Sequence, residues 1–331
     1  MKVSELGEFA LIDLLAKMIG SRQDEQLIIG IGDDAAAWHS DASTQLVTID
    51  SFVQDVHFSL DTASWKDIGW KALAASLSDI AAMGGVPKYA LVSLALPDHT
   101  EVEDVITLYQ GMIELGQEYE ATIVGGNISS SPLVTIVVTI LGSCQRQDKH
   151  LLTRSSSVPG DKVAVTGYLG AAAAGCEMLA NQLQFDPEAA AYLKRAFFRP
   201  CPRIAEGQLL VEQGVKTAID ISDGLISDLN QICKASQVSA RVEVDRVPIL
   251  PIVKANFGSK AVELALSGGE DYELLFTASD EVINKVKEAI SCPVTVIGET
   301  VTGKLNKVTL VDKRGKSFNL NKAGWEHFAI G

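Results

Sequence analysis

The spacing of apolar residues along the chain predicts an alternation of helices and strands. Apolar positions three and four residues apart predict helices in the first half at residues 4–19, 66–83 and 102–118. The same spacing predicts helices in the second half at residues 171–182, 188–197, 203–213 and 225–235. Shorter apolar runs predict strands at residues 45–49, 89–96, 121–124, 133–141, 162–166, 215–219 and 240–244. The pattern therefore predicts an α/β fold of mixed α+β type.

A polar stretch over residues 146–161 separates the two halves and is typical of a linker. The chain of 331 residues is also too long for one ordinary hydrophobic core, and its length suggests about two domains. We therefore expect one domain at residues 1–148 and a second at residues 149–331.

Charge and hydropathy argue against several classes of partner. The chain has 42 acidic and 28 basic side chains, which gives a formal charge of −14. A protein this acidic is not expected to bind nucleic acid or an anionic membrane surface. The longest apolar run, at residues 133–141, is far shorter than the ~20 residues that span a bilayer. Glu5, Glu8 and Asp13 interrupt the apolar stretch that a signal peptide needs.

The five cysteines are widely spaced, and the sequence contains no C-x-x-C pair. A disulfide framework or a structural zinc site is therefore not expected. Reduced thiols in a chain without a targeting signal indicate a cytoplasmic protein.

The acidic side chains gather in five clusters, two of them in the first sixty residues. Asp33 and Asp34 lie in the segment GIGDDAA, where adjacent carboxylates repel one another unless a cation or water separates them. Asp50 ends an apolar strand, where α/β folds present ligands to a cleft, and His57 follows it. A surface turn rich in aspartate would also explain the first cluster, and His57 could be a structural hydrogen bonder.

The helix predicted at residues 66–83 carries two apolar stripes, so we expect it to be buried on both sides. Asp79 lies in the second stripe, among alanines that let other groups approach closely. Because a buried carboxylate without a partner is unfavourable, a metal ion, an arginine or several N–H donors must satisfy Asp79. We favour a metal, and a buried salt bridge or a cap is the alternative.

Two further clusters follow a strand end and a glycine pair. The strand predicted at residues 215–219 leads to Asp220, and Ser222 and Asp223 open the next helix. Asp223 could cap that helix, but capping does not explain Asp220. Two acids at a helix N-terminus suit a metal held against phosphate. Glu270 is the first of three acids in four residues after a glycine pair, where a hairpin turn is the alternative.

Glycine-rich loops give weaker indications of phosphate binding. The loop that contains Gly126 and Asn127 could cradle phosphate through its backbone, or it could be a turn. The segment from Gly167 to Gly170 lacks the spacing of a dinucleotide-binding loop. The sequence has no G-x-x-x-x-G-K-[ST] motif, which excludes a P-loop enzyme.

In this order the segments resemble the thiamine-monophosphate kinase family, in the superfamily that includes aminoimidazole ribonucleotide synthetase and selenophosphate synthetase. Each motif alone is weak, but the set is specific and runs nearly end to end. The motifs are GEFALI (7–12), GIGDDAA (30–36), the segment 50–58, LSDIAAMGG (77–85), GGNIS (125–129), LTRSSSVPGD (152–161), IDISDGLISDL (219–229), SGGEDYELLF (267–276) and GWEHF (324–328).

The resemblance implies an N-terminal ATP- and metal-binding domain that dimerises into a β-barrel, a C-terminal α/β domain, and an active site in a cleft. It implies that the γ-phosphoryl group of ATP is transferred directly to thiamine monophosphate, giving thiamine diphosphate and ADP. This is the last step of thiamine diphosphate biosynthesis, and it uses several Mg²⁺ ions. The chain would then be a phosphotransferase with phosphate as acceptor, and a homodimer.

The resemblance also implies roles for particular residues. Metal ligands would be Asp34, Thr48, Ile49 through its carbonyl, Asp50, Asp79, Asn127, Asp220 and Asp223. ATP would contact Tyr109, Gly126, Asn127, Arg154 and Ser222, and thiamine monophosphate would contact His57, Glu270 and Trp325. Many family members have Asp where this chain has Asn127, and a neutral amide holds Mg²⁺ less strongly than a carboxylate does.

The implied reaction suits these residues. A phosphate monoester has a second pKa of about 6, so the acceptor oxygen is already an anion at neutral pH. No general base or covalent nucleophile is then required, and catalysis becomes positioning and charge neutralisation. Trp325 could stack on the thiazolium or the pyrimidine, and Glu270 could accept a hydrogen bond or offset the thiazolium charge.

Other members of the superfamily are the alternative. A selenophosphate synthetase usually needs a reactive Cys near its N-terminus, and residues 1–30 contain none. The hydrogenase-maturation relative ends in a functional Cys, whereas this chain ends in Gly331. A purine-pathway synthetase would need groups for a ribose phosphate, which nothing in the sequence marks. A nucleotide- and metal-binding regulator without turnover is the alternative from a different class.

Overall fold

The structure is a computed structural model of the chain. It describes residues 27–29, 33–34, 36–40, 43–144, 150–303, 306–320 and 322–326. The helix predicted at residues 4–19 and part of the predicted linker lie outside this described part. Among the helices that are described, none is both long and apolar enough to cross a membrane.

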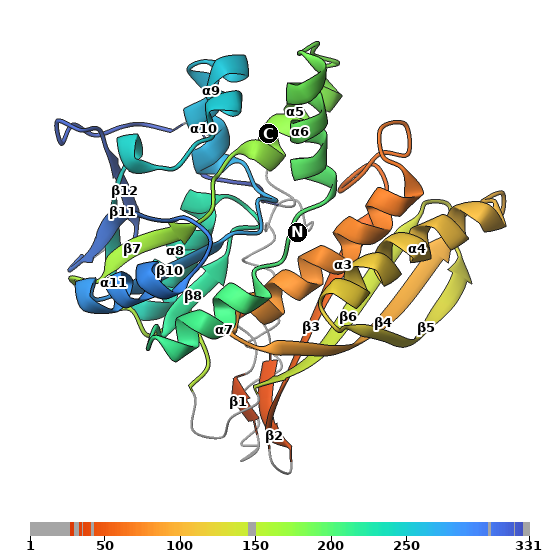
Figure 1. The fold of residues 1–331 in the computed structure, drawn as a ribbon, viewed down its shortest axis with the longest axis horizontal. Helices are drawn as coiled ribbons and strands as arrows, with labels where there is room; N and C mark the ends of the chain where they lie inside the picture. The colour runs from red at the N-terminus through yellow and green to blue at the C-terminus, as the bar shows by residue number, and fades with distance from the viewer. Residues whose placement is uncertain are drawn as a thin grey trace, which may run out of the picture.

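A six-stranded sheet forms the first half of the fold (Figure 1). Its strand order is β1 (Leu27–Ile29), β2 (Ala36–Ser40), β3 (Ser43–Val53), β6 (Thr135–Cys144), β4 (Val86–Leu96) and β5 (Thr122–Ser130). Neighbouring strands are antiparallel, except for the parallel pair β4 and β5. Every second residue of β6 is buried, as expected for a strand with one face packed on the core. Helices α3 (Trp65–Ala82) and α4 (Val102–Glu118) cover that face.

A second six-stranded sheet forms the other half. Its order is β12 (Val308–Val311), β9 (Ser239–Glu243), β11 (Val294–Val301), β7 (Lys162–Thr166), β10 (Leu274–Ala278) and β8 (Thr217–Asp220). Only β12 and β9 are parallel. The helices of this half are α5 (Ala171–Ala180), α6 (Pro187–Phe198), α7 (Ile204–Glu212), α8 (Leu225–Ser236), α9 (Pro251–Phe257), α10 (Lys260–Ser267), α11 (Asp280–Ala289) and the short 3₁₀ helix η1 (Val244–Arg246).

Helix α3 joins the two halves. It contacts β3 and β6 of the first sheet, and it contacts α7 and β8 of the second half. The apolar residues of both predicted stripes are buried, so the prediction of a helix buried on both sides is confirmed. Across the junction, Trp70 Nε1 donates to Pro200 O (3.0 Å). This packing carries Asp79 to the junction of the two halves.

Strand β3 is longer than predicted. The predicted strand stops at Ile49, but β3 continues to Val53 because β6 pairs with it from Asp50 onward, as far as Thr135. The prediction that Asp50 ends a strand is therefore wrong. Its backbone lies within a strand and is paired with Val138 of β6, which fixes the position of its side chain.

Candidate active site

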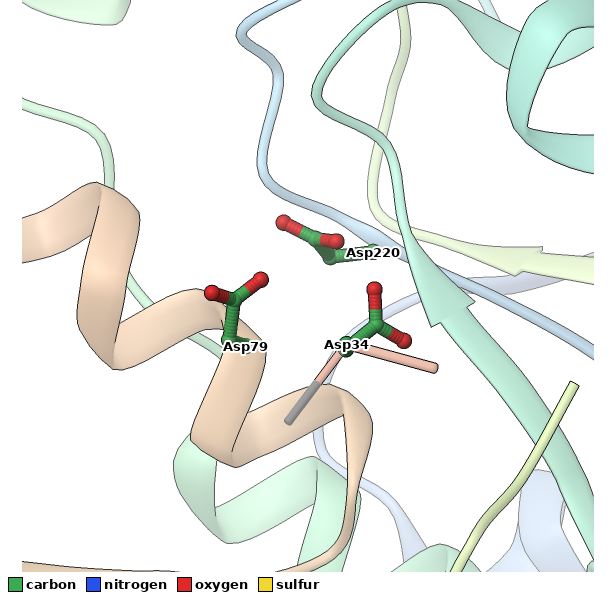
Figure 2. Close-up of side chains that lie close together, drawn as sticks. All are labelled: Asp34, Asp79 and Asp220. Carbon is green, nitrogen blue, oxygen red and sulfur yellow. The ribbon is translucent and has the colours of Figure 1, made fainter. Parts of the chain in front are cut away.

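Three carboxylates converge where α3 meets the two sheets. Asp79 lies on α3, Asp220 is the last residue of β8, and Asp34 precedes β2. One oxygen of each side chain lies within 4.8 Å of an oxygen of the other two. Figure 2 shows the three side chains facing one another, and we call Asp34, Asp79 and Asp220 the acid cluster. Residues predicted as metal ligands from three separate motifs are therefore together in space.

Burial and mutual repulsion set the electrostatics of the acid cluster. Burial raises the pKa of Asp79 well above its usual range, and the neighbouring aspartates raise it further. Burial also raises the pKa of Asp220 to about 8. Two hydroxyls offset part of this effect, because Ser78 Oγ donates to Asp220 Oδ2 (2.7 Å) and Thr48 Oγ1 donates to Asp79 Oδ2. Crowded, buried carboxylates favour a nearby cation, and the acid cluster therefore has the electrostatics of a metal site.

Asp50 adds a fourth carboxylate beside the acid cluster. Burial raises the pKa of Asp50 above its usual range, a hydrogen bond with Ser76 opposes the shift, and the charge of Asp34 adds to it. Within the described residues, the buried Oδ2 atom of Asp50 has no hydrogen-bond partner. A buried oxygen of this kind is unfavourable unless a cation or a donor reaches it. Carboxylate and hydroxyl oxygens are ligands suited to Mg²⁺, so this set of donors fits that ion.

Arg154 contacts both of the adjacent aspartates. Its guanidinium forms an ion pair with Asp34 through Nη2 and Oδ1, and its Nε atom lies 3.6 Å from Asp33 Oδ1. Its backbone N donates to Asp33 Oδ2 (3.1 Å). Burial raises the pKa of Asp33 to about 6, and the charge of Asp34 contributes. Asp33 thus anchors the backbone of the segment that carries Arg154, whereas Asp34 belongs to the acid cluster.

A cavity of about 910 Å³ lies beside the acid cluster. Its wall includes Asp79 and Asp220 from that cluster, together with Asp50. The same wall carries other residues that were predicted to bind metal, ATP or substrate: Ile49, His57, Ser222, Asp223, Glu270 and Trp325. Motifs from both halves of the chain therefore meet in one cavity.

The loop between β8 and α8 presents Asp223 to the cavity. Asp228 caps α8 by accepting from the backbone N of Asp223 (3.2 Å) and of the next residue (3.1 Å). Asp223 itself is not the N-cap residue of α8, because Gly224 occupies that position, so the alternative that Asp223 caps this helix is wrong. Its carbonyl accepts from Trp325 N (2.8 Å), and this bond fastens the C-terminal segment at the cavity.

The three acids after the glycine pair have three different partners. Asp271 caps α5 by accepting from two backbone N–H groups at its start (2.7 and 3.2 Å). Glu273 forms a two-pronged ion pair with Arg203 (2.5 and 2.7 Å). Glu270 lies 2.7 Å from Lys71 Nζ and also lines the cavity. The hairpin alternative is wrong, because this segment is an irregular loop between α10 and β10 and not a turn between paired strands.

Lys71 was not among the predicted site residues. The sequence nevertheless contains an indication of its role, because a lysine inside a helix that is buried on both sides needs a partner of opposite charge. What the pattern of α3 alone cannot identify is the partner, which comes from a distant loop.

Among the five residues predicted to contact ATP, only Ser222 lines this cavity; Arg154 pairs with Asp34, and the other three lie elsewhere. Gly126 and Asn127 lie on the edge strand β5, and Tyr109 lies half-buried on α4. Asn127 is paired with Ser93 of β4. Gly126 packs so closely on β4 that a Cβ atom there would lie 1.9 Å from Val92 O. The structure gives Gly126 a packing role, and the ATP contacts of these three residues stay predictions.

Known proteins resemble this chain over almost its whole length. Its sequence matches the families described as AIR synthase related protein, N-terminal domain (residues 32–144) and C-terminal domain (residues 158–311). The thiamine-monophosphate kinase of Bacillus subtilis (strain 168) is 38% identical over 310 residues, which cover 91% of this chain and 93% of that protein. The thiamine-monophosphate kinase of Escherichia coli (strain K12) is 36% identical over 332 residues, with 98% of both chains covered.

Solved structures are similar to this chain in the same way as the sequence relatives. One that is described as AaThiL complexed with AMPPCP and TMP has a TM-score of 0.86 and 34% identity, with 99% of both chains covered. The hydrogenase maturation protein HypE in complex with ATP has a TM-score of 0.70 at 17% identity, over 96% of this chain and 91% of that one, which shows a shared fold alone. Because relatives more than 30% identical match this sequence nearly from end to end, the chain belongs to the thiamine-monophosphate kinase family.

Proposed function

We propose that this protein transfers the γ-phosphoryl group of ATP to thiamine monophosphate and releases thiamine diphosphate and ADP. The relatives carry the name of this activity, and the similar solved structure is described as a complex with AMPPCP and TMP. The observation that carries the proposal is the acid cluster beside a cavity whose wall also holds His57, Glu270 and Trp325. A site for phosphate-bound metal and a site for a cationic aromatic ring then share one cavity.

The carboxylates of the site would hold Mg²⁺. Asp34, Asp79 and Asp220 would supply ligands, Asp50 would offer its unpartnered oxygen, and Thr48 would add a hydroxyl. The Ile49 carbonyl and Asp223 are further ligands in this proposal, since both residues line the cavity. When bound, Mg²⁺ supplies the positive charge that allows phosphate groups to approach acidic side chains.

Asn127 is the least supported of the proposed ligands. Two strands, β6 and β4, lie between β5 and the β3 residues of the site. At ~4.8 Å for each strand spacing, Asn127 is separated from β3 by roughly 14 Å. Its metal contact therefore stays a prediction.

Other residues of the chain position the phosphates. Asp34 holds the Arg154 guanidinium at the acid cluster, where it is placed to stabilise charge on a transferring phosphoryl group. Ser222 adds a hydroxyl from the loop after β8. His57 Nδ1 accepts from Val53 N (3.0 Å), so the neutral ring carries its proton on Nε2 and can donate from there. Because the acceptor phosphate is already anionic, these residues bind and orient charge and remove no proton.

Trp325 is suited to the ring system of the substrate. Its indole is half exposed at the cavity, and Lys322 Nζ lies 5.0 Å from the ring centre. The ring face thus already accommodates a cation, and a thiazolium ring would receive the same cation–π attraction. The hydrogen bond from Trp325 N to Asp223 O ties this platform to the loop that carries a proposed metal ligand.

The chain is proposed to act as a homodimer through the face of the first sheet that α3 and α4 leave uncovered. Ile49 on that face is 63% exposed, and Leu91 is 40% exposed. The face is apolar over three neighbouring strands and carries no charged side chain in its two central cross-strand rows, Val47–Leu141–Tyr89 and Ile49–Thr139–Leu91. A second copy fits it, because a two-fold contact sets the same uncharged patch against itself.

Two such sheets set face to face would form the dimeric β-barrel that the resemblance implies. In this proposal residues 1–148 are the dimerising, ATP- and metal-binding domain. Residues 149–331 are the domain that supplies Glu270 and Trp325 to the cavity.

A chromatographic assay tests the proposed reaction. The purified protein is incubated with ATP, MgCl₂ and thiamine monophosphate, and thiamine diphosphate and ADP are expected in equal amounts. Chelation of Mg²⁺ with EDTA is expected to abolish both products. Absence of thiamine diphosphate in the presence of Mg²⁺ would sink the kinase proposal, and ATP consumption with a different acceptor would favour another activity of the superfamily.

A further inference from the structure

Lys71 is the largest side chain that the described part of the protein buries completely, and only 2% of it is exposed. Its Nζ atom lies 2.7 Å from Glu270 Oε1 and 3.5 Å from the centre of the Phe197 ring. Among the described residues the ammonium has no hydrogen-bond partner of good geometry, so its charge is met by the ion pair with Glu270 and the contact with the Phe197 ring. Burial removes water from the ammonium, so its position here is unfavourable unless interactions with its partners compensate for the lost hydration.

Both partners of Lys71, Glu270 and Phe197, border the cavity. Glu270 and Phe197 line its wall, whereas Lys71 lies behind them. Lys71, Ala75 and Asp79 follow one another at four-residue spacing on α3, so they share one face of the helix. Ala75 and Asp79 line the same cavity. One helix face therefore supports the acid cluster and Glu270 together.

The backbone around Glu270 is tightly held, whereas its side chain depends on Lys71. Glu270 has a φ of 67°, which a residue with a side chain rarely adopts. Its N–H donates to Ser222 O (2.8 Å), and a Cβ atom on the preceding Gly269 would lie 2.1 Å from the same oxygen. The carboxylate is 28% exposed, and Lys71 contacts its Oε1 atom. Oε2, the oxygen that the contact with Lys71 does not use, is then the one left for a ligand in the cavity.

The ion pair between Lys71 and Glu270 changes the net charge at the cavity wall. The cavity wall already carries several carboxylates, and the proposed substrate brings a phosphate group. An uncompensated Glu270 would repel that phosphate, whereas a paired Glu270 contributes an acceptor without adding net charge.

We propose that Lys71 is a positioning residue for the substrate. It holds the Glu270 carboxylate at the cavity wall and cancels its charge, so that Glu270 accepts a hydrogen bond from an N–H donor of thiamine monophosphate. The proposal rests on the proposed function, and it also limits the role of Glu270, because a carboxylate already paired with Lys71 does not offset the thiazolium charge.

Steady-state kinetics of Lys71→Met test the proposal, since methionine fills the space of the lysine stem without the charge. The KM for thiamine monophosphate is expected to rise about tenfold or more, which corresponds to about 1.4 kcal/mol. The kcat and the KM for ATP are expected to stay within about threefold of wild type. Lys66→Met is the matched control, because Lys66 lies on the same helix and pairs with Glu114 (2.6 Å) on the surface. It should leave all three constants unchanged.

A double-mutant cycle tests whether Lys71 acts through Glu270. In a Glu270→Gln background, Lys71→Met is expected to change the KM for thiamine monophosphate less than about twofold. An undiminished effect in that background would overturn the proposal, as would an unchanged or lower KM in the single variant. A parallel fall in kcat and in both substrate affinities, with a lower melting temperature, would reduce Lys71 to a structural role.

Activity of the wild-type protein distinguishes failure of the inference about Lys71 from failure of the proposed function. If wild type phosphorylates thiamine monophosphate and the KM of Lys71→Met does not change, only the inference about Lys71 fails. If wild type does not phosphorylate it, the proposed function fails and this inference fails with it. Should Lys71→Met not fold, Lys71→Gln, which keeps a polar side chain of similar length, takes its place under the same criteria.

Discussion

The surroundings of Asp79 lower the stability of the metal-free protein, and the same surroundings are the basis of its proposed role in metal binding. Burial and the neighbouring aspartates disfavour its charged form. Asp79→Asn should therefore raise the free energy of unfolding of the metal-free protein by about 1–2 kcal/mol. The same change should remove most of the turnover and the stabilisation by Mg²⁺, which for wild type is about 2.7 kcal/mol at 100 times the dissociation constant. Thermal unfolding in EDTA and in MgCl₂, together with the kinase assay, measures all three effects.

Asp186→Asn is the control for Asp79→Asn. Asp186 caps α6 by accepting from Ala189 N (3.0 Å), and asparagine caps helices equally well. This variant should keep both turnover and the response to Mg²⁺. Near-normal turnover and an unchanged Mg²⁺ response in Asp79→Asn would instead assign Asp79 a structural role.

Asp271 should make stability depend on pH. Burial raises the pKa of Asp271 to about 7 from an ordinary value of 3.8, so the folded protein binds this proton more tightly than the unfolded chain does. The contribution of Asp271 to stability is therefore full below about pH 4 and is lost as the pH rises to about 7. Asparagine keeps an acceptor for the start of α5 but does not titrate.

Asp271→Asn is expected to change how steeply the free energy of unfolding varies with pH. The free energy of unfolding of the variant minus that of wild type should rise by a few kcal/mol between pH 4.5 and pH 8. Urea unfolding at several pH values measures it, and parallel curves for the two proteins would contradict the raised pKa.

At the scale of elements, periodicity in the sequence was enough to locate α3 and its Asp79, because both apolar stripes lie within the helix itself. The end of β3 was missed, since polar Asp50 and Ser51 look like the end of a strand unless the pairing with β6 is known. The cap of α8 was not identified for a similar reason. Asp228 reaches back to the start of its own helix, whereas the capping alternative considered Asp223, which precedes the helix.

Strand β5 offers a test of close packing between elements. Gly126→Ala would place a methyl group 1.9 Å from Val92 O, so β5 must move away from β4. We expect a loss of about 1–3 kcal/mol in the free energy of unfolding. Gly125→Ala is the matched control, because its methyl group would meet only Leu91 Cδ2, a movable side-chain atom, at 3.3 Å. Equal stability of the two variants would contradict the packing role of Gly126.

At the scale of the whole molecule, the site is made of contacts between distant parts of the chain. Arg154 meets Asp34, Ser78 meets Asp220, and Glu270 meets Lys71. Local spacing contains no information about such pairs, so the grouping of these acids was predicted from the resemblance and not from periodicity. The partners that the resemblance did not include, Lys71 above all, became visible only when the chain was folded.

The uncovered sheet face leads to the last prediction, which concerns assembly. A wild-type chain of 35.3 kDa should sediment as a dimer in analytical ultracentrifugation. Leu91→Lys places a charge in the centre of the face, where a two-fold contact would bring two such lysines together, and it should shift the protein to monomers. Because Leu91 is already 40% exposed in the single chain, the change should cost the monomer little stability.

Ile106→Lys separates this effect from a general loss of surface hydrophobicity. Ile106 is 44% exposed on α4, on the opposite side of the sheet, and its replacement should leave the dimer intact. Monomeric wild type, or equal dissociation of both variants, would contradict the assignment of this face. Because Ile49 belongs both to this face and to the cavity wall, monomeric Leu91→Lys should also lose part of its turnover, as expected if a second copy borders the site.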